Sequence, residues 1–233
     1  MAFDRSPPSD VTVVDRFDGG VGWRVHPEER AARTSHAFVA DEEVWVVDPL
    51  DAPGVDDLLT EYGEVAGVAV LSTLHTRDAA AFARRHDVPV SLPPNSERVA
   101  ERLDAPTRRL RNGDGGFTYR QTTPLPSWRE TVAYRASDGT LYAADSLGTV
   151  AGWVTGEERL GVYLFCRPVP PRRLFAGYAP DRVLVGHGDG VFDEASVALD
   201  DALAGARRRF PRALAEDGGA QLRALADALS ASA

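Results

Sequence analysis

The chain has 233 residues, of which 43% are hydrophobic and 26% charged, a globular composition that excludes a disordered or fibrous protein. Its 35 acidic residues outnumber 26 basic ones, which gives a net charge of -9. Such a charge opposes binding to nucleic acid and to anionic lipid, so we expect neither partner. No apolar run approaches the roughly 20 residues that a membrane-spanning helix needs, so no membrane location is expected.

All basic residues are Arg and none is Lys, a pattern typical of acidic halophilic proteins that stay in solution in concentrated salt. The single cysteine, Cys166, cannot form an internal disulfide, and the N-terminus lacks the residue order of a signal peptide. We therefore predict a cytoplasmic location. The length favours one domain over residues 1–233, with residues 1–10 as a loose N-terminal arm.

Short runs rich in Val, Trp and Phe predict an antiparallel sheet near the start of the chain. They cover Val11–Phe17, Val21–His26, Thr34–Ala40 and Val44–Val47. After these strands the hydrophobic period changes, and helices and strands alternate. The predicted elements are a helix from Val55 that stops near Gly63, a strand over Ala66–Leu71, a helix over Asp78–His86, a strand over Val88–Leu92 and a helix over Ser96–Leu103.

Strand patterns return in the second half and predict a second sheet. They cover Arg108–Leu110, Phe117–Gln121, Thr131–Arg135, Thr140–Ala144 and Arg182–Val185. The Pro- and aromatic-rich stretch Gly152–Tyr178 is interpreted as a connecting or lid-like segment. Ala- and Leu-rich helices are expected over Glu194–Phe210 and Gln221–Leu229, separated by Gly218-Gly219. This order of elements predicts an α/β fold, a four-layer αβ/βα sandwich.

Polar residues follow three of the predicted strands, where active sites of α/β proteins usually lie. The segments are Leu74–Asp78, Ala144–Gly148 and Gly186–Asp189. The fold could bring Asp78, Asp145 and His187 into one cleft. Two carboxylates and one imidazole form a competent site for a divalent metal ion.

The order and spacing of these segments resemble the metallo-β-lactamase superfamily over roughly residues 34–188. Val47-Asp48-Pro49 resembles that family's early strand and turn, and Ser72–Asp78 occupies the place of its H-x-H-x-D-H motif. Tyr142–Leu147 resembles the strand with the metal-bridging aspartate, and Val185–Gly188 resembles the late histidine segment. The resemblance implies a four-layer sandwich and a hydrolase that uses metal ions.

The chain departs from the family's pattern at most of the histidine positions. When Asp78 is set on the motif aspartate, Leu74, Thr76 and Ala79 stand where the three motif histidines belong. His75 then falls between ligand positions, and the mid-chain histidine is also absent. The site is therefore expected to be degenerate and to hold at most one divalent ion, Zn²⁺, Mn²⁺ or Fe²⁺, or none.

Two functions follow from these residues. In the first, the protein is hydrolase-like, and Asp78, Asp145 and His187 serve as both the metal ligands and the catalytic residues. In the second, it is a non-catalytic relative that binds a small molecule or a protein partner in a metal-free cleft. The substrate and the oligomeric state stay open.

Each candidate residue also has a purely structural interpretation. Asp78 suits a helix N-terminus, Asp145 a turn, and His187 a tight turn between two glycines. His75 could turn inward as a substitute ligand, but a surface or supporting role is favoured for it, and a buried structural role is favoured for Cys166. Trp128, Arg129 and Glu130 could line the cleft in place of the missing ligand, but an ordinary strand-edge tryptophan beside a solvated pair of Arg129 and Glu130 is favoured.

Overall fold

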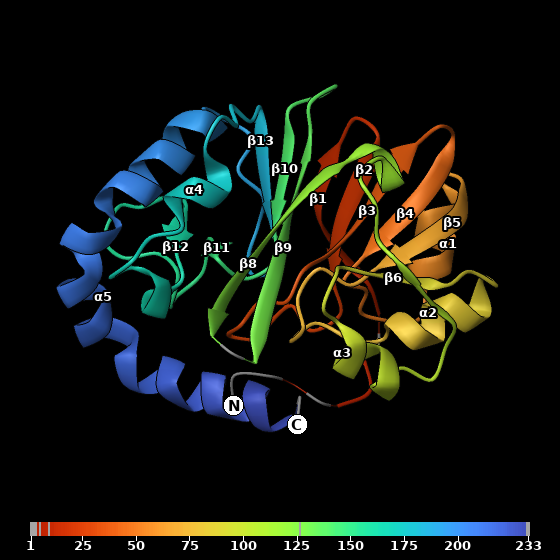
Figure 1. The fold of residues 1–233 in the computed structure, drawn as a ribbon, viewed down its shortest axis with the longest axis horizontal. Coiled ribbons are helices and arrows are strands. Elements are labelled where there is room, and N and C mark those ends of the chain that lie inside the picture. The colour runs from red at the N-terminus through yellow and green to blue at the C-terminus, as the bar shows by residue number, and fades with distance from the viewer. Residues whose placement is uncertain (1–3, 5, 9, 126, 232–233) are drawn as a thin grey trace.

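The computed structural model describes residues 4, 6–8, 10–125 and 127–231. Two β-sheets face each other, and helices cover the outer face of each, so that four layers stack across the molecule (Figure 1). The predicted αβ/βα sandwich is therefore confirmed. Of the predicted N-terminal arm, residues 1–3, 5 and 9 lie outside the described residues, and the amide of Asp4 donates a hydrogen bond to Glu29.

The first sheet contains seven strands that are hydrogen-bonded in chain order. They are β1 (Thr12–Phe17), β2 (Gly20–Arg24), β3 (Ser35–Ala40), β4 (Glu43–Val47), β5 (Glu64–Ala69), β6 (Val90–Leu92) and β7 (Thr107–Arg109). The first four pair antiparallel, as their tight acidic and glycine turns predict, whereas β4 to β7 pair parallel across helical connections. The prediction that placed residues 108–110 in the second sheet is wrong, because this strand pairs with β6.

Three helices cover the outer face of the first sheet: α1 (Val55–Thr60), α2 (Ala79–Arg85) and α3 (Glu97–Arg102). Their apolar residues recur at helical spacing and pack on the sheet, as Leu58, Leu59 and Phe82 do. The short connections hold the sheet and its helices together, and they leave the chain segments after β4 and β5 at one edge of the sheet.

The second sheet has the strand order β13-β10-β9-β8. Its members are β8 (Thr118–Leu125), β9 (Trp128–Arg135), β10 (Thr140–Ala143) and β13 (Arg182–Val185), and the short η1 (Asp114–Gly116) precedes β8. Strands β10 and β13 run parallel, so the segments that follow them emerge at the same edge. Buried side chains such as Phe38, Leu71, Tyr142 and Leu184 fill the space between the two sheets.

The stretch over residues 152–178 is a compact layer against the second sheet and contains short elements. These elements are β12 (Gly161–Val162), η2 (Leu164–Cys166) and α4 (Arg172–Phe175). Strand β12 pairs with β11 (Leu147–Gly148), which precedes the stretch. The long helix α5 (Ala195–Ala231) packs over this layer and over β13 (Figure 1).

The expected break in the C-terminal helices does not occur, because α5 continues through Gly218 and Gly219. Tertiary contacts on both sides of the glycines hold the helix: Asp217 accepts a hydrogen bond from the amide of Gly152, and the side chain of Gln221 donates one to Ala151. No helix within the described part of the chain is long and apolar enough to span a membrane.

Candidate metal centre

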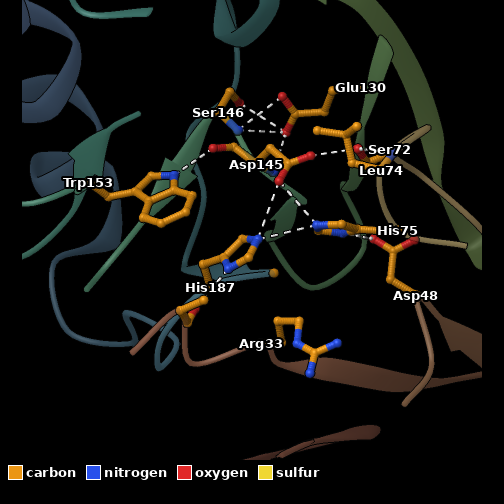
Figure 2. A network of polar contacts seen from close by, with 12 residues as sticks. Arg33, Asp48, Ser72, Leu74, His75, Glu130, Asp145, Ser146, Trp153 and His187 are labelled. Carbon is orange, nitrogen blue, oxygen red and sulfur yellow. Dashed lines mark hydrogen bonds and ion pairs between the residues drawn. The ribbon is translucent and has the colours of Figure 1, made fainter. Parts of the chain in front are cut away.

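Three side chains from distant parts of the chain converge at the edge where β5, β10 and β13 end. Asp145 follows β10, His187 follows β13, and His75 lies in the loop between β5 and α2. The Nε2 atoms of the two imidazoles are 3.2 Å apart, and Oδ1 of Asp145 lies 3.1 Å from His75 and 3.3 Å from His187 (Figure 2). All three side chains are buried, with residue exposures of 4%, 5% and 3% for His75, Asp145 and His187.

Hydrogen bonds on the second oxygen fix the carboxylate of Asp145. Oδ2 accepts hydrogen bonds from the hydroxyl of Ser72 at 2.5 Å and from the indole N–H of Trp128 at 3.2 Å. Only Oδ1 is therefore turned toward the imidazoles. Trp128 is buried and bonded to the site, so the interpretation of this residue as a strand-edge tryptophan is wrong.

The outer ring nitrogens of both histidines are also held. Nδ1 of His187 lies 2.8 Å from the carbonyl oxygen of Ala31, which can only accept, so this nitrogen carries a proton. Nδ1 of His75 lies 3.1 Å from Oδ2 of Asp48. In their neutral forms both rings therefore turn an unprotonated Nε2 atom toward Asp145. Metal-binding histidines are commonly oriented in this way by a hydrogen-bond partner on the other ring nitrogen.

Asp48 links the two sheets beneath the site. Its carboxylate accepts hydrogen bonds from the amide of Leu71, at 2.8 Å, and from the hydroxyl of Tyr142 on β10, also at 2.8 Å. The backbone of Asp48 has a left-handed φ of 48°, which turns the chain sharply after β4. Burial, and then the charge of Asp48, holds the pKa of Tyr142 well above its usual value, so the phenol keeps its proton and donates it.

Glu130 holds the backbone of Asp145 from the opposite side. Its buried carboxylate accepts hydrogen bonds from the amides of Asp145 and Ser146 and from the hydroxyl of Ser146, at 2.9 to 3.0 Å (Figure 2). Burial, and then the charge of Asp145, raises the pKa of Glu130 to about 7. The expected solvated pair with Arg129 is therefore wrong. The sequence contained one indication of this role, because Glu130 stands next to the apolar run of a predicted buried strand.

The three converging groups shift one another's proton affinities. Burial and Arg77 lower the pKa of His75, but Asp145 and Asp48 raise it by more, and the net shift is upward. Burial dominates at His187, and its pKa is lowered. Burial alone would raise the pKa of Asp145, but the two imidazoles hold it well below its usual range. Of the two imidazoles, His75 is therefore the one that binds a proton more readily when no metal ion is present.

The donor set and its spacing fit a single divalent transition-metal ion. Three ligand atoms at about 2.0 to 2.1 Å from a tetrahedral Zn²⁺ lie about 3.3 to 3.4 Å from one another. The three atoms here are 3.1 to 3.3 Å apart, which is close to one face of such a tetrahedron. Two imidazoles and one carboxylate also form the three-ligand set of catalytic zinc sites and of non-haem iron sites.

Of the three predicted site residues, the structure brings Asp145 and His187 together and places Asp78 elsewhere. Oδ2 of Asp78 accepts a hydrogen bond from the amide of Asp51 at 2.8 Å, and the residue precedes α2 on the outer surface. Among the described residues, the group that could hold an ion contains His75 in its place. Between these two residues, Arg77 has a left-handed backbone with a φ of 38°. The side chain of His75 on one side of this turn points into the site, and that of Asp78 on the other side points away from it.

Aromatic side chains cover the imidazole of His187. The ring of Trp153 stacks on the imidazole of His187, with centroids 4.5 Å apart and an interplanar angle of 17°. The indole N–H of Trp153 donates a hydrogen bond to the carbonyl of Asp145. Trp153 packs in one cluster with Trp128, Tyr163 and the partly buried Leu74. Cys166 borders this cluster, and burial raises the pKa of its thiol to about 12, which fits the expected structural role.

The structure is similar to solved metallo-β-lactamases along most of its length. DIM-1 metallo-β-lactamase matches with a TM-score of 0.60 and 10% identity over 88% of this chain and 99% of its own. The enzyme from Pontibacter korlensis gives 0.57 and 14%, over 84% of this chain and 99% of its own. A mutant flavo di-iron protein from Thermotoga maritima gives 0.58 and 15%, over 86% of this chain and 62% of its own.

At these identities the similarity defines the fold class. The chain therefore has the metallo-β-lactamase fold, with a three-residue His75, Asp145 and His187 group at the sheet edge. No protein-family model matches the chain, and no curated protein matches it in sequence.

Proposed function

We propose that this protein is a hydrolase-like metalloprotein that binds one divalent ion through His75, Asp145 and His187. The observation that carries the proposal is the convergence of three hydrogen-bond acceptors. Two imidazole nitrogens made bare by their Nδ1 partners and one carboxylate oxygen meet within 3.3 Å, and such a group requires a cation or a proton between its members.

Each residue of the site has a separate task in this proposal. His75, Asp145 and His187 hold the ion, and Asp48 and the carbonyl of Ala31 fix the ring orientations. Ser72 and Trp128 keep the second oxygen of Asp145 away from the ion. Such an ion supplies Lewis acidity and, at neutral pH, an activated water for hydrolysis.

Metal content measured by elemental analysis tests the site. We expect about one equivalent of Zn²⁺, Mn²⁺ or Fe²⁺ in the wild-type protein and a loss of most of it in Asp145→Ala and His75→Ala, because each removes one of three ligands. Asp78→Ala is the matched control and should keep the wild-type content, because Asp78 faces Asp51. Equal metal in the wild-type protein and in Asp145→Ala would refute the proposal.

One observation favours a second candidate function, that of a non-catalytic binding protein of this fold. The three ligands are almost completely buried, and Trp153 covers His187, so the space for a substrate beside the ion is restricted. Hydrolysis of 4-nitrophenyl esters and phosphates by the metal-loaded protein separates the two functions. Turnover that Asp145→Ala abolishes supports the hydrolase, and bound metal without turnover supports the binding protein.

A further inference from the structure

A cavity of about 480 Å³ opens between the edges of the two sheets, away from the candidate metal centre. The edge strand β7 and the chain after it form one wall, and the edge strand β8 forms the other. The lining residues are Pro93, Pro94, Arg109, Leu110, Arg111, Asn112, Tyr119, Gln121 and Thr131. From these residues we infer that the cavity binds a small organic anion.

Two guanidinium groups without a carboxylate partner line this cavity. The side chains of Arg109 and Arg111 form no ion pair with any described residue, whereas the preceding residue, Arg108, pairs with Asp114. Both side chains therefore keep their charge available to a ligand in the cavity. They supply the planar, multiple donors that recognise carboxylate or phosphate groups.

A buried hydroxyl at the inner wall provides the independent observation. Thr131 is only 2% exposed and lines the cavity, and its Oγ1 has no hydrogen-bond partner within the described structure. A buried polar atom without a partner costs free energy, and native proteins usually satisfy such atoms with protein, water or ligand. A ligand group that reaches the inner wall beside Thr131 would supply the missing partner of this hydroxyl.

The other polar groups of the wall already use their acceptor atoms or their donors. The amide oxygen of Asn112 accepts from the amide of Tyr119, so the free part of Asn112 is its NH₂ group. The side chain of Gln121 donates to the carbonyl of Pro94, and the hydroxyl of Tyr119 donates to the carbonyl of Asp114, so the oxygens of these two side chains stay available as acceptors. The two guanidinium groups and the NH₂ group of Asn112 offer more donors than these acceptors, and the guanidinium charge selects an anion over a cation.

The apolar residues of the wall indicate what the uncharged part of the ligand looks like. Pro93, Pro94 and Leu110 offer apolar surface, and the ring of Tyr119 adds an aromatic face. This combination of apolar walls and a few convergent polar groups is typical of small-molecule sites. The cavity fits a ligand with a flat or aliphatic body and one carboxylate or phosphate group.

Phenyl phosphate is a suitable probe, with phenol and inorganic phosphate as its two halves. We expect saturable binding of phenyl phosphate by calorimetry, weaker binding of each half, and amide shifts in NMR spectra over residues 109–112 and 119–121. Arg109→Ala/Arg111→Ala should weaken binding by about tenfold or more, because charge-assisted hydrogen bonds are lost. Thr131→Val, which keeps the volume and removes the hydroxyl, should also weaken binding.

Two controls make the test specific. Arg173→Ala/Arg208→Ala removes two exposed arginines that also have no ion pair with a described residue, one from α4 and one from α5, and binding should stay within twofold. Asp145→Ala should also bind normally, because the cavity is separate from the metal centre. All proteins are compared at one ionic strength, at which each variant has the same circular dichroism spectrum as the wild type.

Several results would overturn the inference. One is the absence of saturable binding to the wild-type protein, and another is an equal loss of binding in the Arg109/Arg111 and Arg173/Arg208 double variants. A third is a loss of phenyl phosphate binding in Asp145→Ala, or NMR shifts at the candidate metal centre instead of the cavity. Equal binding of phenol and phenyl phosphate would also contradict it, because the anionic group would then make no contribution.

Discussion

Glu130 influences the candidate metal centre without facing the proposed ion. Its carboxylate accepts three donors from Asp145 and Ser146, so it fixes the backbone from which the Asp145 side chain projects. Groups that orient a metal ligand commonly change metal affinity 10- to 100-fold when they are replaced, by an order-of-magnitude rule. Substitution of Glu130 should therefore change the metal affinity, although Glu130 is not a proposed ligand.

We predict that Glu130→Gln weakens metal binding by about tenfold while the protein still folds, because an amide replaces one of two acceptor oxygens. Competition with a metal-binding dye measures the affinity, and the visible spectrum of the Co²⁺-loaded protein should change as Asp145 shifts. Glu97→Gln, at an exposed position on α3, is the control. An unchanged affinity and Co²⁺ spectrum would show that Glu130 has no positioning role.

The sequence predicts two of the three members of the site, because Asp145 and His187 each follow an apolar strand in a recognisable order. For the third position the sequence favoured Asp78, because the family motif aligns this loop by its aspartate, whereas the structure places His75 in the group and Asp78 against the amide of Asp51. His75 enters the site through a left-handed turn at Arg77 and a bond to Asp48, 27 residues earlier. Neither the turn nor the long-range bond has a signal in a single sequence.

At the scale of elements, a buried ion pair holds the layer over residues 152–178 beneath α5. Glu158 accepts from Arg167 at 3.1 Å and from Arg209 of α5 at 3.2 Å, and the side chains of Glu158 and Arg167 are fully buried. Arg167 also donates to the carbonyl of Trp153, the residue that stacks on His187. This pair therefore connects the long helix with the cover of the metal centre.

We predict that Glu158→Ala lowers the free energy of unfolding by about 3 to 5 kcal/mol, because it leaves the charge of Arg167 buried without its partner. Glu158→Leu combined with Arg167→Met should restore much of this loss, since both charges are then absent. Urea denaturation measures both variants. Glu61→Ala, which breaks the exposed pair with Arg16, should cost much less, because solvent screens this pair. Equal losses in Glu158→Ala and Glu61→Ala would contradict the prediction.

Most elements follow from local patterns, and the exceptions have physical causes. The first four strands are short runs rich in Val, Trp and Phe, and their predicted bounds lie within two residues of those observed. Strand β7 has only three residues, and its pattern does not reveal which sheet supplies its partner. The glycine pair in α5 suggested a break, but contacts of Asp217 and Gln221 with the preceding layer hold the helix.

At the scale of the whole molecule, the acidic composition leads to a prediction about salt. Glu43 and Glu64 are exposed and directly paired on neighbouring strands, so like charges face each other within a net charge of -9. Salt screens such repulsion, since the Debye length falls from about 10 Å at 0.1 M to about 3 Å at 1 M. We propose that the protein is adapted to high salt.

We therefore expect the midpoint of thermal unfolding to rise by at least about 2 °C between 0.1 M and 2 M KCl. Glu43→Gln/Glu64→Gln should raise the midpoint at 0.1 M and reduce its salt dependence, because it removes one facing pair of charges. Calorimetry measures both effects. A midpoint that is independent of KCl would contradict adaptation to salt.

The four-layer architecture was predictable because strands and helices alternate in a characteristic order along the chain. The chemistry was less predictable, because the site is assembled from residues that are far apart in sequence. Two imidazoles and one carboxylate replace the expected two carboxylates and one imidazole. In the proposed site, the second imidazole favours Zn²⁺ or Fe²⁺ over harder ions such as Mn²⁺.

His75 and His187 stand 112 residues apart, and they meet only after β13 has paired with β10. During synthesis on the ribosome, the earlier histidine emerges long before its counterpart exists. The nascent chain therefore cannot bind a metal ion in the proposed site with all three ligands until residue 187 has been synthesised. In the proposed site, ion binding would follow the pairing of β13 with β10 and would stabilise the native state.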